Sequence, residues 1–400
     1  MRVKFKSSYS IWGKRGFGLG KILIYKGLYQ YDAVNVFADE LAEGLRLFGR
    51  TVVTVNLTDH ESATAALRRE LAEPCELVLS FGGVGWDLKS GNDLLHNALP
   101  YPFATILVDH PLYHINRLVI KRMKASCFDR SHLCFLRRHK PDLDSFLLAH
   151  GGCSAEDEPM PFEKRDISIL CPCSYIDSEP PLQRIKKQPP QIEKCLLAAA
   201  EILFSTHGLP VEHAFEKAVR ETNLSTEDPL LEGNRYYDYL GLLDVLHRAR
   251  KRLGILNALD KAGIPVVICG NSWPKGLFTH HEFIGPKNFR EVLSLMTRSR
   301  CVLNMALVPD GSHERVFSAM LNGALALSES NPFYEQHFTD GRHILFYRWT
   351  ELDLLPERIS SFLSKPDAMA KIAHTGQRRA AEHHTWKQRA GTLLSVLTKG

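Results

Sequence analysis

Short, uniformly apolar runs alternate with amphipathic stretches along most of this chain, and that alternation limits the possible folds more than any other feature. The run at 21–25 predicts a strand, and apolar residues recur at helical spacing from 32 to 48. The later strands of this half are predicted at 51–55, 76–80 and 104–108. Strands that are apolar on both faces and alternate with helices indicate a parallel sheet covered by helices. We therefore predict one Rossmann-like domain at 1–160.

A second region of the same kind follows a linker at 158–163, where two prolines at alternate positions disfavour a helix. Its strands are predicted at 166–170, 265–269, 301–304, 324–327 and 344–347. The Pro- and Lys-rich stretch 178–190 is predicted to be an exposed loop, and 191–260 has a helical pattern throughout. We expect a C-terminal Rossmann-like domain at 161–385 that contains a helical insertion at 191–260.

Composition supports two domains and excludes several function classes. A chain of 400 residues exceeds what one hydrophobic core usually organises. Lys and Arg number 50 and Asp and Glu 45, so the net charge of +5 is only a mild bias toward anionic ligands, without the dense basic clusters of a dedicated nucleic-acid binder. The sequence has no apolar stretch long enough to span a membrane, and the start of the chain does not resemble a secretion signal. Nine scattered cysteines, none at metal-site spacing, indicate reduced thiols in a cytoplasmic protein without a bound metal.

The clearest chemical signal lies between one predicted strand and the next helix in the C-terminal half. The strand is predicted to end near Asn304, a loop with Asp310 and Gly311 follows, and a helix then runs from about His313 to Gly323. Backbone N–H groups at a helix start, together with the helix dipole, form an anion site, and glycine lets a phosphate approach the main chain. The segment therefore predicts a phosphate site at the carboxyl end of a strand.

Side chains in the first turn of that helix suit this interpretation. Ser312 is a good N-cap residue, and Arg315 could donate charge-assisted hydrogen bonds to a diphosphate. The alternative is an ordinary capped helix in which Arg315 pairs with a nearby carboxylate. Such turns are common, so residue types alone do not separate the two interpretations.

A family resemblance favours the phosphate site. The segment 310–323 resembles the signature of retaining GT-B glycosyltransferases, and the pentapeptide at 315–319 is closer still to the pattern of their CgeB-like branch. Flanking segments resemble further elements of this family in the same order, at 268–273, 283–285 and 384–389. The resemblance implies a GT-B fold with two facing Rossmann-like domains, the C-terminal one holding a nucleotide-sugar donor. It also implies that the amphipathic stretch 386–400 is a last helix that crosses back to the N-terminal domain.

The resemblance further implies roles for individual residues near the donor phosphates and sugar. The first acid of the family motif, close to the sugar and phosphate, falls on Asp310. The donor diphosphate would be held at the helix start by Gly311, Ser312, His313, Glu314 and Arg315.

The resemblance also implies contacts to the nucleoside. The second acid of the motif, which binds the ribose hydroxyls, falls on Ser318, which is shorter and neutral, so this contact is lost or is made instead by Glu314 or Glu335. The residues that would contact the base are Gly270, Asn271 and the backbone at Ile284.

Acceptor-side residues are expected where strands of the N-terminal domain end. Asp109 could orient His110 as a catalytic base or contact the donor sugar; alternatively it caps a turn. Trp86, within a glycine-rich turn, could stack on a sugar or belong to the core. Gly27, directly after the first strand, is a candidate for a glycine loop near the ligand.

These observations predict a glycosyltransferase that moves a hexose from a nucleotide-diphosphate donor to a hydroxyl of an unidentified protein, glycan or small molecule. Helix N–H groups and Arg315 would stabilise the leaving diphosphate without a metal or other cofactor, and the resemblance implies retention of configuration. Two alternatives stay open. One is a nucleotide-sugar epimerase or hydrolase on the same fold, and the other is a catalytically silent nucleotide- or sugar-binding protein.

Overall fold

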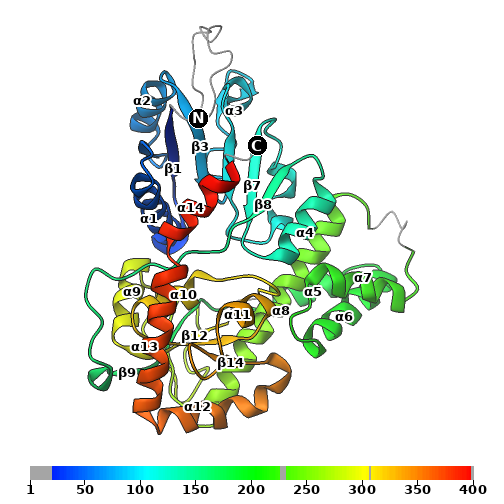
Figure 1. Cartoon of the computed structure of the whole chain (residues 1–400). Coiled ribbons are helices and arrows are strands. Elements are labelled where there is room, and N and C mark those ends of the chain that lie inside the picture. Colours follow the sequence, from blue (N-terminus) through cyan, green and yellow to red (C-terminus); the bar gives the residue numbers. More distant parts are fainter. Residues whose placement is uncertain (1–19, 226–230, 306–307, 398–400) are drawn as a thin grey trace. The chain divides into compact units, whose positions relative to one another are not determined.

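The computed structural model describes residues 20–225, 231–305 and 308–397, and the chain divides into two compact units (Figure 1). The first unit contains residues 1–153 and 383–400, and the second contains residues 154–382. Each unit holds one parallel six-stranded sheet. The α/β class predicted from the alternation of strands and helices is confirmed.

The sheet of the first unit has the order β2-β1-β3-β6-β7-β8, and all neighbouring strands are parallel. Its strands are β1 (Lys21–Lys26), β2 (Val52–Asn56), β3 (Cys75–Phe81), β6 (Phe103–Ile106), β7 (Met123–Cys127) and β8 (Asp144–Leu147). A small antiparallel hairpin consists of β4 (Lys89–Ser90) and β5 (Asp93–Leu94). The side chains of β1 from Ile22 to Tyr25 are buried, as expected for a strand with neighbours on both sides and helices on its faces.

The helices of this unit are α1 (Ala33–Leu47), α2 (His60–Leu71), α3 (Leu95–Ala98), α4 (Arg130–His139) and α14 (Trp386–Leu397). The last helix, red in Figure 1, packs against α1. The contact is close because α1 has a glycine there: a Cβ added at Gly44 would lie 2.9 Å from that of Ala390. Trp386 stacks on Phe37 at 5.3 Å and meets the edge of Phe81 at 5.4 Å, so the end of the chain completes the core of the first unit.

The sheet of the second unit has the order β11-β10-β9-β12-β13-β14, again parallel throughout. Its strands are β9 (Ile167–Pro172), β10 (Val267–Cys269), β11 (Glu282–Phe283), β12 (Ser299–Asn304), β13 (Leu325–Glu329) and β14 (Leu345–Tyr347). Its helices are α5 (Glu179–Lys186), α6 (Pro190–Ser205), α7 (Val211–Glu221), α8 (Asn234–Lys261), α9 (Phe289–Thr297), α10 (Glu314–Leu321), α11 (Pro332–His337), α12 (Leu355–Leu363) and α13 (Pro366–His383).

Sequence reasoning was wrong about the stretch 178–190, which is not an exposed loop. Helix α5 occupies most of it and packs against α8. Pro180 and Pro181 stand in the first turn of α5, where no intrahelical N–H bond is required, so these prolines start the helix instead of breaking it. Pro181 and Ile185 are buried against the neighbouring helices.

Two strands of the first unit, β7 and β8, were not predicted from the sequence. Polar residues interrupt both of them: Lys124 and Ser126 in β7, and Asp144 and Ser145 in β8. Strand β8 lies at the edge of the sheet, where one side needs no strand partner and polar side chains reach water. The uniformly apolar signature of a central parallel strand is therefore absent from β8, and in β7, which lies between β6 and β8, the buried Ser126 interrupts it.

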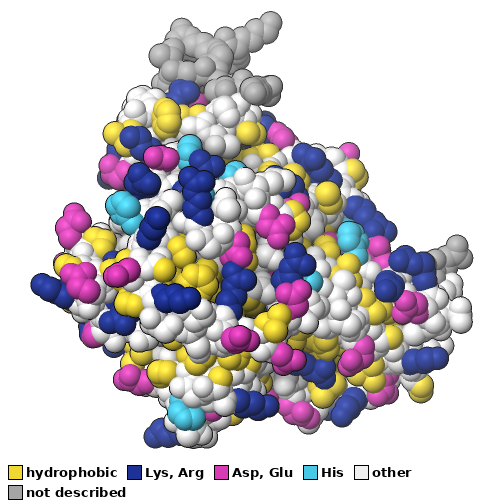
Figure 2. Space-filling view, turned by 60° about the horizontal axis from the view of Figure 1, so that its bottom comes forward, with side chains coloured by type: hydrophobic (Ala, Val, Ile, Leu, Met, Phe, Trp, Pro, Cys, Tyr) yellow, Lys and Arg dark blue, Asp and Glu magenta, His cyan; other side chains and the backbone are white. Residues whose placement is uncertain are grey.

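The surface carries charges of both signs. On the face drawn in Figure 2, Lys and Arg side chains lie among Asp and Glu side chains, with no extended patch of one sign among the described residues. Of the helices that the structure describes, none combines the length and the apolar composition needed to cross a membrane.

Candidate functional site

The second unit reverses its winding direction between β9 and β12. From β9 the chain adds β10 and β11 on one side, and it then returns to add β12, β13 and β14 on the other. In open α/β sheets, ligands bind beside such a switch point, at the carboxyl ends of the strands. Cys173–Ser174 follow the carboxyl end of β9, and residues 308–313, which lead into α10, come after β12. These segments therefore define the candidate site.

Two guanidinium groups come to this switch point from different helices. Nη1 of Arg315, on α10, donates to Oδ1 of Asn304 at 3.1 Å, and Nδ2 of Asn304 donates to Oγ of Ser328 at 3.0 Å. Arg252, on α8, donates to the backbone carbonyl of Ser174. Burial lowers the pKa of Arg252, and the positive charge of Arg315 lowers it further.

The sequence motif identified Arg315 but not Arg252, which stands in a basic run at 248–252. Such a run is typical of a solvated helix face, but two of its residues depart from this pattern: Lys251 is buried and Arg252 points to the end of β9. The sequence did contain a signal of burial, because apolar residues flank the basic run on both sides. Two of them, Leu246 and Ile255, are also buried. A helix that is apolar on more than one side is a buried helix.

The start of α10 differs from the predicted anion site in one respect. His313, not Ser312, is the N-cap residue: its Nδ1 accepts from the backbone N–H of Arg315 at 3.2 Å. The backbone N–H of His313 donates to the hydroxyl oxygen of Tyr334 at 2.8 Å. Ser312 is fully buried. The predictions that Ser312 caps the helix and that these two backbone N–H groups are available to an anion are wrong, because side chains already accept from them.

Acidic and glycine residues of the predicted motif do lie beside this helix start. Oε2 of Glu314 is 2.6 Å from Nδ1 of His313, and Asp310 is partly buried in the preceding turn. Asn331 fixes the loop, because its Nδ2 donates to the carbonyl of Gly311 at 3.1 Å. The structure therefore brings Asp310, Gly311 and Glu314 to the carboxyl end of β12 together with Arg315.

The position of the second motif acid is closed to ligands in this conformation. Ser318 lies in the middle of α10 and is fully buried. Its backbone carbonyl accepts from Nδ2 of Asn322 at 2.7 Å. Glu335, one of the two acids considered as a substitute, is half exposed on α11.

The residues expected near a nucleotide base meet at the next strand ends. A Cβ at Gly270 would lie 2.1 Å from the carbonyl oxygen of Cys173, so only glycine fits this close approach of the segments after β9 and β10. The backbone N–H of Asn271 donates to Oγ of Ser174 at 3.3 Å, and that of Ile284 donates to the carbonyl of Ile268 at 3.0 Å. Gly270 and Asn271 therefore hold two segments of the switch point together, and Ile284 continues the pairing of β10 with β11.

The two predicted catalytic residues of the first unit lie in different environments. Asp109 is exposed, whereas His110 is buried and caps its own turn, because its Nδ1 accepts from the backbone N–H of Leu112 at 3.1 Å. That bond leaves the proton of the neutral ring on Nε2. Burial lowers the pKa of His114, while the charge of Asp109 raises it, so the carboxylate of Asp109 lies within electrostatic reach of His114.

Two further candidates of the first unit are structural. Trp86 is only 3% exposed, and the guanidinium carbon of Arg117 covers its ring at 4.3 Å from the ring centre. The side-chain amide of Asn35 bonds both backbone groups of Gly27. Its Oδ1 accepts from the N–H of Gly27 at 3.1 Å, and its Nδ2 donates to the carbonyl of Gly27. The hydroxyl of Tyr29 donates to the carbonyl of Phe81 at 2.6 Å, which ties the ends of β1 and β3 together.

A buried ion pair stands at the carboxyl end of β13. Nζ of Lys251 contacts Oε2 of Glu329, and Nδ1 of His207 lies 3.1 Å from Oε1 of the same carboxylate. Nε2 of His207 bonds the carbonyl of Ser330 at 2.9 Å. Burial alone would raise the pKa of Glu329, but Lys251 and His207 lower it to about 2. Because His207 belongs to the connection between α6 and α7, the helical insertion reaches the strand ends.

Metal ligands do not converge in the described ranges. Within residues 20–225, 231–305 and 308–397, no three His, Cys, Asp or Glu side chains are arranged to hold a metal ion.

Comparison with known proteins identifies the fold. Residues 250–395 match a family model described as glycosyl transferase-like. The structure is similar to sucrose-phosphate synthase from Thermosynechococcus elongatus, with a TM-score of 0.56 and 11% identity over 95% of this chain and 98% of that one. It is also similar to HepE from Anabaena in complex with UDP-glucose, with a TM-score of 0.53 and 10% identity over 95% of this chain and all of that one. A search of curated protein sequences finds no match to this chain. The predicted GT-B fold is confirmed.

Proposed function

We propose that this protein is a glycosyltransferase that transfers a hexose from a nucleoside-diphosphate donor to an acceptor hydroxyl, and that it belongs to the CgeB-like branch. The observation that carries the proposal is the convergence of Arg252 and Arg315 at the switch point of a GT-B unit. The family match over residues 250–395 contains both arginines. HepE, similar in fold, was solved with UDP-glucose, which agrees with a nucleotide sugar as the donor.

The two guanidinium groups would carry most of the phosphate binding. Arg315 uses one nitrogen on Asn304, and a guanidinium group has five N–H donors in total, so others are left for phosphate oxygens. Side chains accept from the backbone N–H groups of His313 and Arg315, so the helix contributes through its dipole more than through these amides. Two positive groups beside the leaving diphosphate stabilise its developing charge, which supports transfer without a metal.

The remaining roles follow from position. Asp310, in the turn before α10, is proposed to face the donor sugar, and the retaining outcome proposed here follows the family resemblance. Asp109, exposed at a strand end of the first unit, is proposed as an acceptor-side carboxylate. His110 is proposed to position that turn, because its Nδ1 is occupied by a backbone N–H and cannot take a proton there.

The test is incubation of the full chain with a panel of UDP-, GDP- and CDP-sugars, with release of the free nucleoside diphosphate as the readout. We expect release with one donor class. We expect Arg315→Ala to lower it about 100-fold, the usual effect of removing one donor to a developing negative charge. The matched control is Arg290→Ala, since Arg290 makes an exposed ion pair with Glu156 at 2.8 Å and should keep full activity.

Three outcomes contradict the proposal. An altered sugar that stays attached to its nucleotide would indicate the epimerase. Binding of a nucleotide sugar without turnover, in the presence of candidate acceptors, would indicate a silent binding protein, an alternative favoured by the burial of Ser318. Equal activity of Arg315→Ala and Arg290→Ala would remove the proposed donor site.

A further inference from the structure

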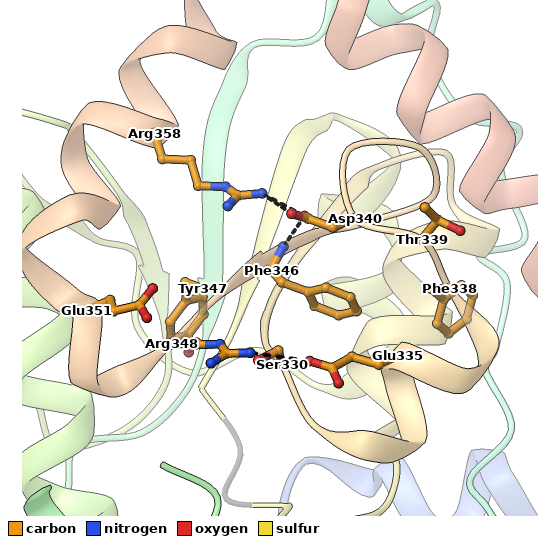
Figure 3. A pocket seen from close by; sticks show the side chains of 10 residues that line it. All are labelled: Ser330, Glu335, Phe338, Thr339, Asp340, Phe346, Tyr347, Arg348, Glu351 and Arg358. Carbon is orange, nitrogen blue, oxygen red and sulfur yellow. Dashed lines mark hydrogen bonds and ion pairs between the residues drawn. The ribbon is translucent and has the colours of Figure 1, made fainter. Parts of the chain in front are cut away.

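A cavity of about 400 Å³ opens beside β14, the edge strand of the second sheet (Figure 3). We call it the β14 pocket. It is lined by residues of α11, of β14, of α12 and of the segments that connect them, including Glu335, Phe346 and Arg358. Tyr334 of α11 contacts the start of α10, whereas its neighbour Glu335 lines this pocket. Consecutive residues of a helix point in different directions, so the pocket lies on another face of α11 from the candidate donor site.

One wall of the β14 pocket is fixed. Nη2 of Arg358 lies 2.6 and 2.5 Å from the two carboxylate oxygens of Asp340. Oδ1 of Asp340 also accepts from the backbone N–H of Phe346 at 2.9 Å, so the carboxylate occupies an outward-facing donor of the edge strand. Arg358, Asp340 and Phe346 therefore form a preorganised polar wall, visible in the upper part of Figure 3.

The opposite side of the pocket carries charged side chains whose capacity for hydrogen bonds and ion pairs is not fully used within the protein. Nη2 of Arg348 is 4.0 Å from Oε1 of Glu335, which is too far for a hydrogen bond, and the two side chains are 52% and 50% exposed. Glu351 is exposed and makes no ion pair within the part of the chain that the structure describes. These three side chains can turn toward a ligand without breaking a buried interaction.

The donors, acceptors and aromatic side chains that line the pocket indicate which kind of ligand would fit it. The lining combines guanidinium donors with carboxylate acceptors, the hydroxyls of Ser330 and Thr339, and the aromatic side chains of Phe338, Phe346 and Tyr347. An anion would meet three carboxylates, and a cation would meet two guanidinium groups. A neutral polyhydroxylated molecule both donates and accepts at every hydroxyl, and its C–H faces suit an apolar surface, so it satisfies both kinds of group.

We propose that the β14 pocket binds a neutral saccharide. Its volume is within the range of small-molecule pockets, roughly 300–1,000 Å³. A site on this unit, apart from the switch point, would hold a carbohydrate chain next to the catalytic machinery without competing with the nucleotide. The inference goes beyond the proposed function, because binding here requires neither the donor nor turnover.

The experiment is calorimetric titration of the full chain with neutral mono- and disaccharides, and with glucosamine, glucuronate and inorganic phosphate as charged probes. We expect at least one neutral disaccharide to bind. Arg348→Ala and Glu351→Gln should each weaken that binding at least tenfold. The matched control is Arg342→Ala, because Arg342 is exposed on the nearby loop and does not line the pocket.

A second titration, with UDP, GDP and CDP, separates this proposal from the donor site. The pocket variants should keep nucleotide binding, and Arg315→Ala should keep saccharide binding while it loses the nucleotide. The proposal is overturned if no neutral saccharide binds, if only a charged probe binds, or if Arg348→Ala and Glu351→Gln bind like the Arg342→Ala control.

Discussion

Each unit contains a buried Lys–Glu ion pair, but the two pairs lie at opposite ends of their sheets. In the first unit, Lys21 begins β1 and contacts Glu70 at 2.5 Å, at the amino end of the strands. In the second unit, Lys251 contacts Glu329 at the last residue of β13, at the carboxyl end. Ligands of α/β sheets bind at carboxyl ends. The first pair therefore serves the fold alone, and the second stands where the chemistry is expected.

The partners of the two lysines differ as well. Lys21 is 8% exposed and has a second carboxylate, that of the exposed Glu73, at 2.8 Å. Lys251 is 4% exposed, and the second oxygen of its carboxylate partner lies 3.1 Å from Nδ1 of His207. Removing one acid would thus leave Lys21 paired and Lys251 buried without a carboxylate.

The largest expected effect comes from removing that carboxylate. Glu329→Gln should lower the free energy of unfolding by about 3–5 kcal/mol, because it leaves a buried ammonium group without its counter-charge. The matched variant Glu70→Gln should cost only about 1–2 kcal/mol, since Glu73 remains. Urea unfolding of both variants measures this difference. Equal losses would mean that the two pairs are equivalent, and the contrast between the units would fail.

The same pair predicts a pH dependence. The pKa of Glu329 falls from 4.5 to about 2 in the folded protein, so its contribution is complete above about pH 4.5 and is lost as the pH falls toward 2. The shift corresponds to about 3 kcal/mol. The free energies of unfolding of the unchanged protein and of Glu329→Gln, measured by urea titration between pH 6 and pH 2, should converge by about this amount. A difference between them that is constant with pH would contradict the assignment.

The smallest expected effect tests the switch point of the first unit. Between β1 and β3, the hydroxyl of Tyr29 bonds the carbonyl of Phe81 and closes the strand ends, whereas the equivalent place in the second unit holds two arginines. Tyr29→Phe should lower the free energy of unfolding by about 1 kcal/mol and leave nucleotide-sugar turnover within twofold of the unchanged protein. A large loss of turnover with little loss of stability would show that the first switch point also binds a ligand.

Much of the architecture could be predicted because the pattern of apolar and polar residues indicates which side chains are buried. Central strands such as β1 must be apolar on both faces, and helices such as α1 show an apolar face at helical spacing. The prediction failed where the pattern was mixed, at the polar edge strand β8 and at α5, where prolines were interpreted as a loop although they stand in the first helical turn.

The candidate site could be predicted only in part. Arg315, Gly311 and Asp310 lie close together along the chain, so a local motif identifies them. Arg252 is distant in sequence, and a basic residue on a helix gives no sign of which strand end it will meet. The cap residue was missed for a different reason: N-cap propensity favours the serine at 312, whereas in the folded chain the imidazole of His313 reaches the N–H of Arg315.

The sequence by itself determined that the chain forms parallel α/β sheets and that a strand–loop–helix element with Gly311 and Arg315 lies at a strand end, because periodicity and local spacing are properties of neighbouring residues. Only the tertiary structure decided which amides at that helix start are occupied, which second arginine lies at the same switch point, and that charged and aromatic side chains enclose a cavity beside β14. These features join residues that are far apart along the chain, and only tertiary packing brings such residues together.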